Sequence, residues 1–178
     1  MKNRSWLLLS LVFTLGIAVG ALARGGAKGD PSVFKGKSKS EAAKSLLMLA
    51  EAQAGKGSWE NIAVGRTYYL GGMKKEGQAI FDSVTSKKAE GSDWMRIGRI
   101  YYDAGEWDKA KTAFDKALAL EKNDAAWLAE VGGYYNLKGD RAKAEEMFEH
   151  SLKVEGGEVW NTVNMAGSYL GVEPRGNS

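Results

Sequence analysis

Apolar and small residues recur along the chain at the spacing of helix faces. Between residues 94 and 102 they stand three and four positions apart, at Trp94, Ile97, Gly98, Tyr101 and Tyr102. This spacing places them on one side of an α-helix. A second set with the same spacing follows at Ala110, Ala113, Phe114, Ala117 and Leu118. Gly105 stands between the sets, where glycine ends a helix without backbone strain. The pattern predicts two helices joined by a tight turn.

The same pattern occurs three times. The shift along the chain that superimposes Gly98 on Gly132 also superimposes Phe114 on Phe148. A nearly equal shift in the other direction superimposes Gly98 on Gly65. The three copies cover approximately 58–90, 91–124 and 125–158. A constant period of this kind indicates a repeat protein in which each helical hairpin packs on the next.

The repeated positions resemble those of the tetratricopeptide repeat (TPR) family. In the second copy they are Trp94, Ile97, Gly98, Tyr101, Gly105, Ala110, Phe114 and Ala117. The other copies depart from the family pattern at Asn61, Gly77, Leu128 and Ser151, and all three lack the usual proline near the repeat end. The resemblance covers residues 40–171. It implies an all-α, right-handed solenoid with three full repeats flanked by half-repeat helices.

A lone second helix is expected before the first full repeat. Leu47 superimposes on Phe114 when the two shifts are added together. Residues 40–54 are therefore predicted to form a helix. Ser38 and Glu41 have the spacing of a capping box, in which each side chain satisfies a backbone N–H of the first turn.

A lone first helix is expected after the third repeat. Trp59 superimposes on Trp160 after three successive shifts. Residues 158–170 are therefore predicted to form a helix equivalent to the first helix of each repeat. Residues 172–178 are expected to form a frayed tail.

Residues 1–23 have the layout of a secretory signal peptide. Lys2 and Arg4 precede an uncharged stretch that runs from Trp6 to Ala23, and Ala21-Leu22-Ala23 is a small-x-small cleavage pattern. The sequence leaves two alternatives open, a cleaved leader and a retained membrane anchor; contact with a membrane is expected only for the anchor. Both predict an exported protein, periplasmic or extracellular, or anchored facing the periplasm. The glycine- and lysine-rich segment 24–39 is expected to be a flexible basic linker.

Composition argues against an enzyme. The chain has no cysteine and one histidine, which excludes disulfides, thiolate metal sites and multi-histidine centres. His150 and Glu146 are expected to form a surface pair on one helix. No catalytic, cofactor-binding or metal-binding residue is predicted, and no cofactor. Residues 58–178 carry 16 Lys and Arg against 19 Asp and Glu, so no basic face for nucleic acid is expected.

The resemblance also implies where a partner would bind, because the first helices of TPR hairpins line a concave groove. The residues predicted to bind a peptide there are Arg66, Tyr69, Arg96, Arg99, Tyr102 and Asn136. Trp59 is a further groove position. Arginine and tyrosine dominate binding hot spots, and converging guanidinium groups predict an acidic peptide or a C-terminal carboxylate as ligand.

The alternative interpretation of these positions is a solvated groove wall whose charge is offset by Asp103 and Glu130. At the level of function, the sequence predicts a non-catalytic protein-binding module of the cell envelope that acts as a scaffold or assembly factor. The alternative is a structural component that self-associates, or joins a larger assembly, through its end helices.

Overall fold

The computed structural model describes residues 26–86 and 88–174, and this part of the chain contains helices and no strand. The predicted signal peptide lies outside the described residues. Within these ranges eight α-helices follow one another, with these bounds: α1 Lys39–Ala54, α2 Ser58–Leu70, α3 Lys74–Thr85, α4 Gly91–Asp103, α5 Trp107–Leu120, α6 Ala125–Leu137, α7 Arg141–Glu155 and α8 Val159–Tyr169. None of the described helices is long and apolar enough to cross a membrane.

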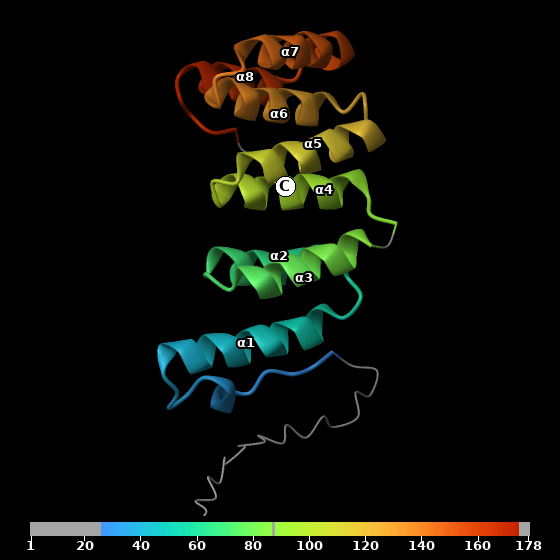
Figure 1. Ribbon diagram of the computed structural model, residues 1–178. Helices are drawn as coiled ribbons and strands as arrows, with labels where there is room; N and C mark the ends of the chain where they lie inside the picture. The colour runs from blue at the N-terminus through green and yellow to red at the C-terminus, as the bar shows by residue number, and fades with distance from the viewer. Residues whose placement is uncertain (1–25, 87, 175–178) are drawn as a thin grey trace, which may run out of the picture.

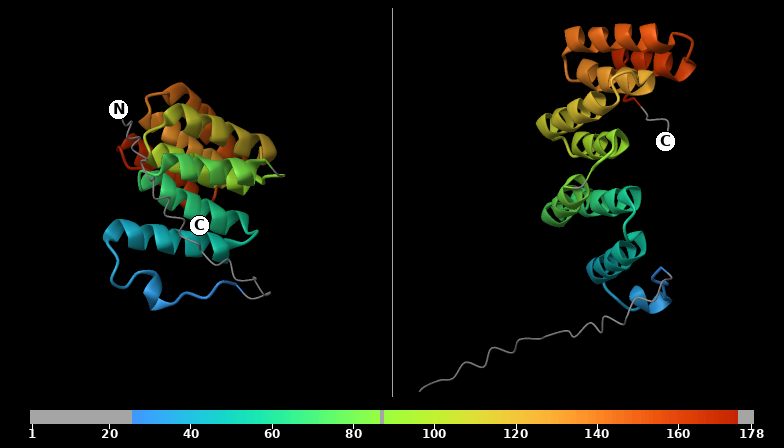
Figure 2. Two further views of the ribbon diagram at one scale, coloured as in Figure 1. Left: turned by 60° about the horizontal axis from the view of Figure 1, so that its bottom comes forward. Right: turned by 90° about the vertical axis from the view of Figure 1, so that its right-hand side faces the viewer.

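The helices stack into a solenoid of hairpins (Figure 1). Each predicted repeat corresponds to one hairpin: α2 with α3, α4 with α5, and α6 with α7. Both views in Figure 2 show the same succession from α1 at one end to α7 and α8 at the other. The predicted all-α solenoid is confirmed.

A glycine from the first helix meets a phenylalanine ring of the second helix in every hairpin. A Cβ atom added to Gly98 would lie 2.5 Å from ring carbons of Phe114. The pairs Gly65–Phe81 and Gly132–Phe148 repeat this arrangement at 2.6 Å. Real Cβ atoms do not approach ring atoms so closely, so only glycine lets these two helices come together.

The turns within the hairpins use glycines in the left-handed conformation. Gly72, Gly105 and Gly139 have φ angles of 90°, 75° and 89°. Residues with a side chain rarely adopt these angles. Each repeat therefore needs glycine at two positions, one for the close approach of its helices and one for the turn between them.

Aromatic rings join the second hairpin to the third. The ring of Tyr134 on α6 stacks on Phe114 at a centroid distance of 5.1 Å and lies 4.3 Å from Tyr102. Trp107 packs edge-on against Tyr135 at 5.0 Å. These aromatic side chains fill the space between the hairpins and continue the core from one repeat into the next.

The N-terminal flank is more ordered than the sequence predicts. The capping box of α1 is confirmed: Glu41 N donates to Ser38 Oγ at 3.3 Å, and Ser38 N donates to Glu41 Oε2 at 3.1 Å. The segment expected to be a flexible linker contains a short 3-10 helix, Pro31–Val33, which packs on α1. Gln53 of α1 also donates a hydrogen bond to the carbonyl oxygen of Ala27 at 2.9 Å. This bond and the packing of the 3-10 helix hold the segment against α1.

The C-terminal segment also departs from the expected frayed tail. After α8, Gly171 takes a φ of 78° and the chain turns back toward α6 (Figure 1). Pro174 is buried, and its carbonyl oxygen accepts a hydrogen bond from the Tyr134 hydroxyl at 3.5 Å. The described part of the tail, up to Pro174, is therefore seated on the solenoid.

Candidate functional site

The candidate site is the surface formed by the first helices of the hairpins, α2, α4 and α6. Two of its arginines pair with acids on the following hairpin. Arg66 on α2 donates to Asp103 on α4 at 3.1 Å. Arg99 on α4 donates to both carboxylate oxygens of Glu130 on α6, at 2.6 and 2.7 Å. The equivalent arginines of the first two repeats thus each pair with an acid of the next hairpin, although the two acids stand at different repeat positions.

The third repeat continues this series with a different residue pair. Gly133 occupies the position of Arg66 and Arg99, and the neighbouring Asn136 makes the bond to the next helix. Its side-chain amide donates to Ser168 Oγ on α8 at 2.9 Å. Asn136, predicted to bind a peptide, therefore holds α8 on the solenoid.

The Arg99–Glu130 pair is the most buried of these contacts. The Glu130 side chain is 3% exposed and the Arg99 side chain 22%. Burial alone would lower the pKa of Arg99, but the hydrogen bonds and negative charge of Glu130 outweigh it and leave that pKa raised. Two charges this well paired in a desolvated site form part of the structure of the junction between repeats.

Arg96 differs from the other two arginines. Its guanidinium group lies 3.7 Å from the centroid of the Trp59 ring, the distance of a cation–π contact. No salt bridge of Arg96 is found in the part of the chain that the structure describes, and its buried Nε atom has no hydrogen-bond partner there. Trp59 itself is 53% exposed. The Trp59–Arg96 pair is therefore the accessible aromatic and cationic part of the candidate site.

Tyr69 does not belong to an open groove wall. Its ring is 1% exposed and packs against Phe81 and Tyr101 at centroid distances of 5.6 and 5.5 Å. Its hydroxyl donates to Glu106 at 2.5 Å and accepts from Lys109 at 2.9 Å. Tyr69, predicted to bind a peptide, is thus buried between the first two hairpins and does not present its side chain to a partner.

Glu106 is the centre of a polar cluster that the sequence analysis did not identify. Besides the Tyr69 hydroxyl, it binds the ammonium groups of Lys74 and Lys109. The hydrogen bonds from Lys109, Lys74 and Tyr69, in that order of effect, lower the pKa of Glu106 to about 2. These three partners come from α5, α3 and α2, so only the stacked hairpins bring them together.

Tyr102 is also buried rather than free. It is 9% exposed, and its ring lies 4.3 Å from that of Tyr134. The Lys138 ammonium group lies over the Tyr102 ring at 4.6 Å. Burial raises the pKa of the Tyr102 hydroxyl, and the negative charge of Glu173 in the tail contributes to the same effect. Tyr102 is thus surrounded by residues of its own chain, including the C-terminal segment.

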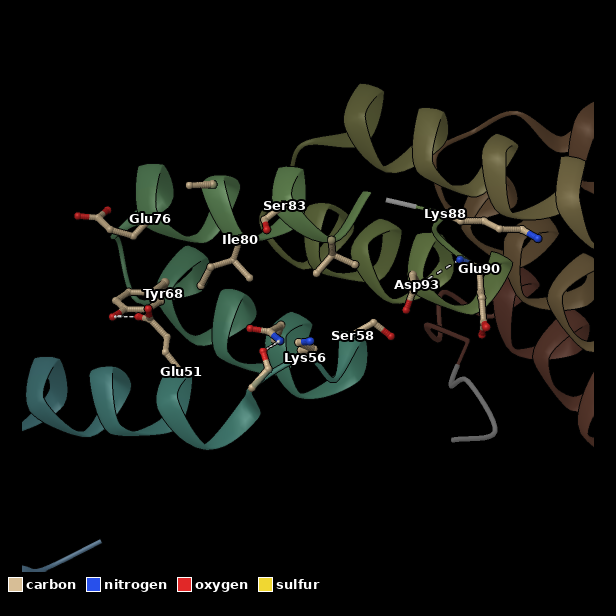
Figure 3. A pocket seen from close by; sticks show the side chains of 14 residues that line it. Glu51, Lys56, Ser58, Tyr68, Glu76, Ile80, Ser83, Lys88, Glu90 and Asp93 are labelled. Carbon is tan, nitrogen blue, oxygen red and sulfur yellow. Dashed lines mark hydrogen bonds between the residues drawn. The ribbon is translucent and has the colours of Figure 1, made fainter. Parts of the chain in front are cut away.

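A separate hollow of about 570 Å³ lies among α1, α2, α3 and the start of α4 (Figure 3). Tyr68 donates a hydrogen bond to Glu51 at 2.5 Å in this hollow, and its pKa is raised to about 12 by burial and by that bond. Asp93 caps α4 by accepting from Glu90 N at 3.1 Å. The described lining residues include both acids and lysines, and among them no nucleophile is paired with a base.

The single histidine takes a structural role different from the one predicted. His150 forms a hydrogen bond between its Nε2 atom and Asn123 Oδ1 at 3.1 Å, while Glu146 pairs with Lys143. The expected His150–Glu146 pair is therefore wrong: each side chain has a nearer partner. Among the described residues, no group of three or more His, Asp or Glu side chains is placed to hold a metal ion.

Comparison with known proteins identifies one of the hairpins. Residues 92–124, which comprise nearly all of α4 and the whole of α5, match the model of the tetratricopeptide repeat family. No curated protein is similar enough to the chain to count as a match. The α4–α5 hairpin is thus similar to a tetratricopeptide repeat, and the hairpins on either side of it repeat its glycine–phenylalanine contact and its glycine turn.

Proposed function

We propose that this protein is a non-catalytic protein-binding module whose first-helix surface binds a segment of a partner protein. The single observation that carries the proposal is the Trp59–Arg96 pair. An exposed tryptophan that stacks on an incompletely satisfied guanidinium group combines the two residue types that contribute most to protein interfaces. The similarity of residues 92–124 to a tetratricopeptide repeat supports this interpretation, because such repeats generally bind proteins.

The chemistry of this pair favours an acidic partner segment. A guanidinium group binds carboxylates through charged hydrogen bonds, while the tryptophan ring provides an apolar surface beside it. Arg66 and Arg99 do not add to this site, since Asp103 and Glu130 neutralise them. The proposed anionic contact is therefore a single carboxylate at Arg96, in place of a cluster of three arginines. Such a contact weakens with salt.

The test uses Trp59→Ala and Arg96→Gln with Leu120→Ala as matched control. Leu120 is exposed to a similar extent and lies on α5, outside the first-helix surface. A partner captured from the native host should bind the Trp59 and Arg96 variants at least tenfold more weakly and the control with parental affinity. If Trp59→Ala and Arg96→Gln both bind the partner with parental affinity, the proposal is refuted.

A second function is favoured by the surface of α8. Val159, Trp160 and Val163 of α8 are exposed apolar side chains, and Leu170, which directly follows the helix, is 82% exposed. In a solenoid, such a surface is where the next helix would pack. If it joins two copies or a larger assembly, the mass of the protein will rise with concentration, and Trp160→Asp will abolish that rise.

We also propose that the protein is exported, as the leader over residues 1–23 indicates. The expected mature chain begins at Arg24, in the periplasm or outside the cell. The alternative is an anchored protein that faces the same compartment. N-terminal sequencing of the exported protein distinguishes them, because an anchored chain keeps Met1 and is extracted only by detergent.

A further inference from the structure

The C-terminal segment occupies the end of the first-helix surface. Pro174 lies against Gly133 on α6: a Cβ atom added to Gly133 would come within 3.2 Å of Pro174 Cγ. Tyr134, the next residue of α6, donates its hydroxyl to the carbonyl oxygen of Pro174 at 3.5 Å. Both contacts are made by a residue that is itself buried, so the segment is in close contact with α6 at this point.

The glycine at position 133 is what makes room for the segment. The equivalent positions of the first two repeats carry Arg66 and Arg99, whose long side chains cross to the next hairpin. At Gly133 that side chain is missing, and Pro174 fills the space. Helical glycine is less stable than alanine by about 1 kcal/mol, and the position is not a helix end. The contact with Pro174 explains why glycine occurs at this position inside the helix.

The residues before Pro174 lead the chain from α8 to this surface. Val172 N donates to Gly167 O at 2.9 Å, the same helix-end bond that follows α2, α4 and α6, and a Cβ atom added to Gly167 would lie 3.5 Å from Val172 Cβ. Glu173 lies close enough to Tyr102 on α4 for its charge to act on that hydroxyl. The Lys138 ammonium group lies over the same Tyr102 ring at 4.6 Å. In this chain the surface thus holds a proline that follows an acidic residue.

We infer that α4, α6 and α8 form a binding site for an extended segment with an acidic residue followed by proline, and that the C-terminal segment of the same chain is its resident occupant. A partner segment of this chemistry binds there by displacing Glu173 and Pro174. The inference rests on the proposed protein-binding function and places a second contact region at the opposite end of the first-helix surface from Trp59.

Because the segment is tethered to α8, it occupies the site even though each of its contacts is weak. Only Leu170, Gly171 and Val172 separate α8 from Glu173 and Pro174, and a short tether gives an effective concentration in the millimolar range. A free peptide at micromolar concentration cannot compete with it. Release of the segment should therefore expose the site and strengthen binding of an added peptide.

The experiment uses the full chain and a dye-labelled synthetic peptide with the sequence of residues 169–178. Pro174→Asp places a carboxylate in a buried position close to Tyr134 and Glu130 and releases the segment. Val172→Asp adds the same charge at an exposed position and is the matched control. By fluorescence anisotropy, the peptide should bind Pro174→Asp at least tenfold more tightly than the parent or the control.

A second substitution tests the site itself. Gly133→Val in the Pro174→Asp background fills the space of the proline and should reduce peptide binding at least tenfold. Gly133→Ala, a milder change that favours the helix, should reduce it less, and circular dichroism verifies that both keep the parental helix content. The inference is overturned if the peptide binds parent and Pro174→Asp equally, if it binds neither up to millimolar concentration, or if filling Gly133 has no effect.

These outcomes are independent of the proposed function. If the peptide results are negative while Trp59→Ala still weakens partner binding, only the inference about the C-terminal segment fails. If the peptide results are positive while the Trp59 and Arg96 variants bind a partner normally, the proposed site at Trp59 fails instead. Peptide binding to the parent that rises on dilution would show that the segment occupies the groove of a second copy, which overturns the intramolecular assignment.

Discussion

Replacement of Arg99 by leucine should destabilise the solenoid through the acid that it leaves behind. Glu130 is 3% exposed, so without Arg99 its charge stays in a site that water barely reaches. Removal of one partner of a buried ion pair costs about 3–5 kcal/mol. The Arg99 side chain is itself 22% exposed, which lets some water approach the vacated space. We therefore expect a loss near the lower end of that range, about 3 kcal/mol.

The matched comparison is Arg66→Leu. Arg66 occupies the equivalent repeat position and also pairs with an acid of the next hairpin, but its side chain is 55% exposed and that of Asp103 is 39% exposed. Exposed ion pairs contribute between zero and about 1 kcal/mol. Arg66→Leu should therefore cost less than about 1 kcal/mol, although both arginines occupy the same repeat position and each pairs with an acid of the next hairpin.

Urea denaturation followed by circular dichroism measures both effects, provided that the dependence on urea concentration is unchanged. The double variant Arg99→Leu, Glu130→Leu removes both charges and should recover most of the lost stability, because no unpaired charge remains. Equal losses for Arg66→Leu and Arg99→Leu would refute the argument from burial. A double variant no more stable than Arg99→Leu would show that the hydrogen bonds, and not the unpaired charge, determine the cost.

Three further predictions concern the repeat core and the polar cluster. Gly98→Leu should cost about 3 kcal/mol by overpacking, since even a Cβ atom meets the Phe114 ring at 2.5 Å; a thermal melt at the parental temperature would contradict the helix register. Phe114→Ala, which empties a fully buried site, should cost about 3–5 kcal/mol and melt neighbouring repeats together, as amide hydrogen exchange would show. The lowered pKa of Glu106 adds stability above its ordinary pKa of 4.5, and that stability is lost as pH falls toward 2; in acid titrations Glu106→Gln should therefore lose less stability than the parent over this range.

The repeat pattern predicted the fold because the same residues meet two backbone requirements in each copy. Gly98 and its equivalents permit the close approach of two helices, and Gly105 and its equivalents permit the turn. Residues with a Cβ atom do not permit this close approach and rarely adopt the turn angles, so periodic glycines in the sequence correspond to periodic geometry. The helix faces follow from the helical period alone.

The roles of the site residues did not follow from that pattern. Arg66 bonds to a residue 37 positions later, and Arg99 to one 31 positions later, so the acids do not recur with the period of the repeats. Periodicity identifies which face of a helix a side chain lies on, but a long side chain reaches beyond its own face. The sequence placed Arg66 and Arg99 on the first helices; their pairing with the next hairpin depends on side-chain reach.

Neither the buried tyrosines nor the seated tail had a signal in the sequence. Tyr69 and Tyr102 stand at positions that line the groove in the family pattern, yet neighbouring aromatic rings cover both in this chain. Pro174 follows a helix end and lies among polar residues, which is the composition of a frayed terminus. Pro174 can pack on α6 because Gly133 stands where the first two repeats have a long arginine side chain. The contact between Gly133 and Pro174 becomes visible only when α6 and the tail are placed together.

These assignments separate residues that stabilise the solenoid from residues that are free to bind. A triple replacement of Arg66, Arg96 and Arg99 by glutamate would not measure binding, because Arg99→Glu places a second carboxylate beside the buried Glu130 and would disrupt the junction of α4 with α6. Arg96 contacts the ring of Trp59 and has no acidic partner among the described residues, so its replacement leaves no buried charge. A loss of partner affinity in Arg96→Gln at unchanged stability can therefore be attributed to the surface itself, whereas the same loss in Arg99→Glu cannot.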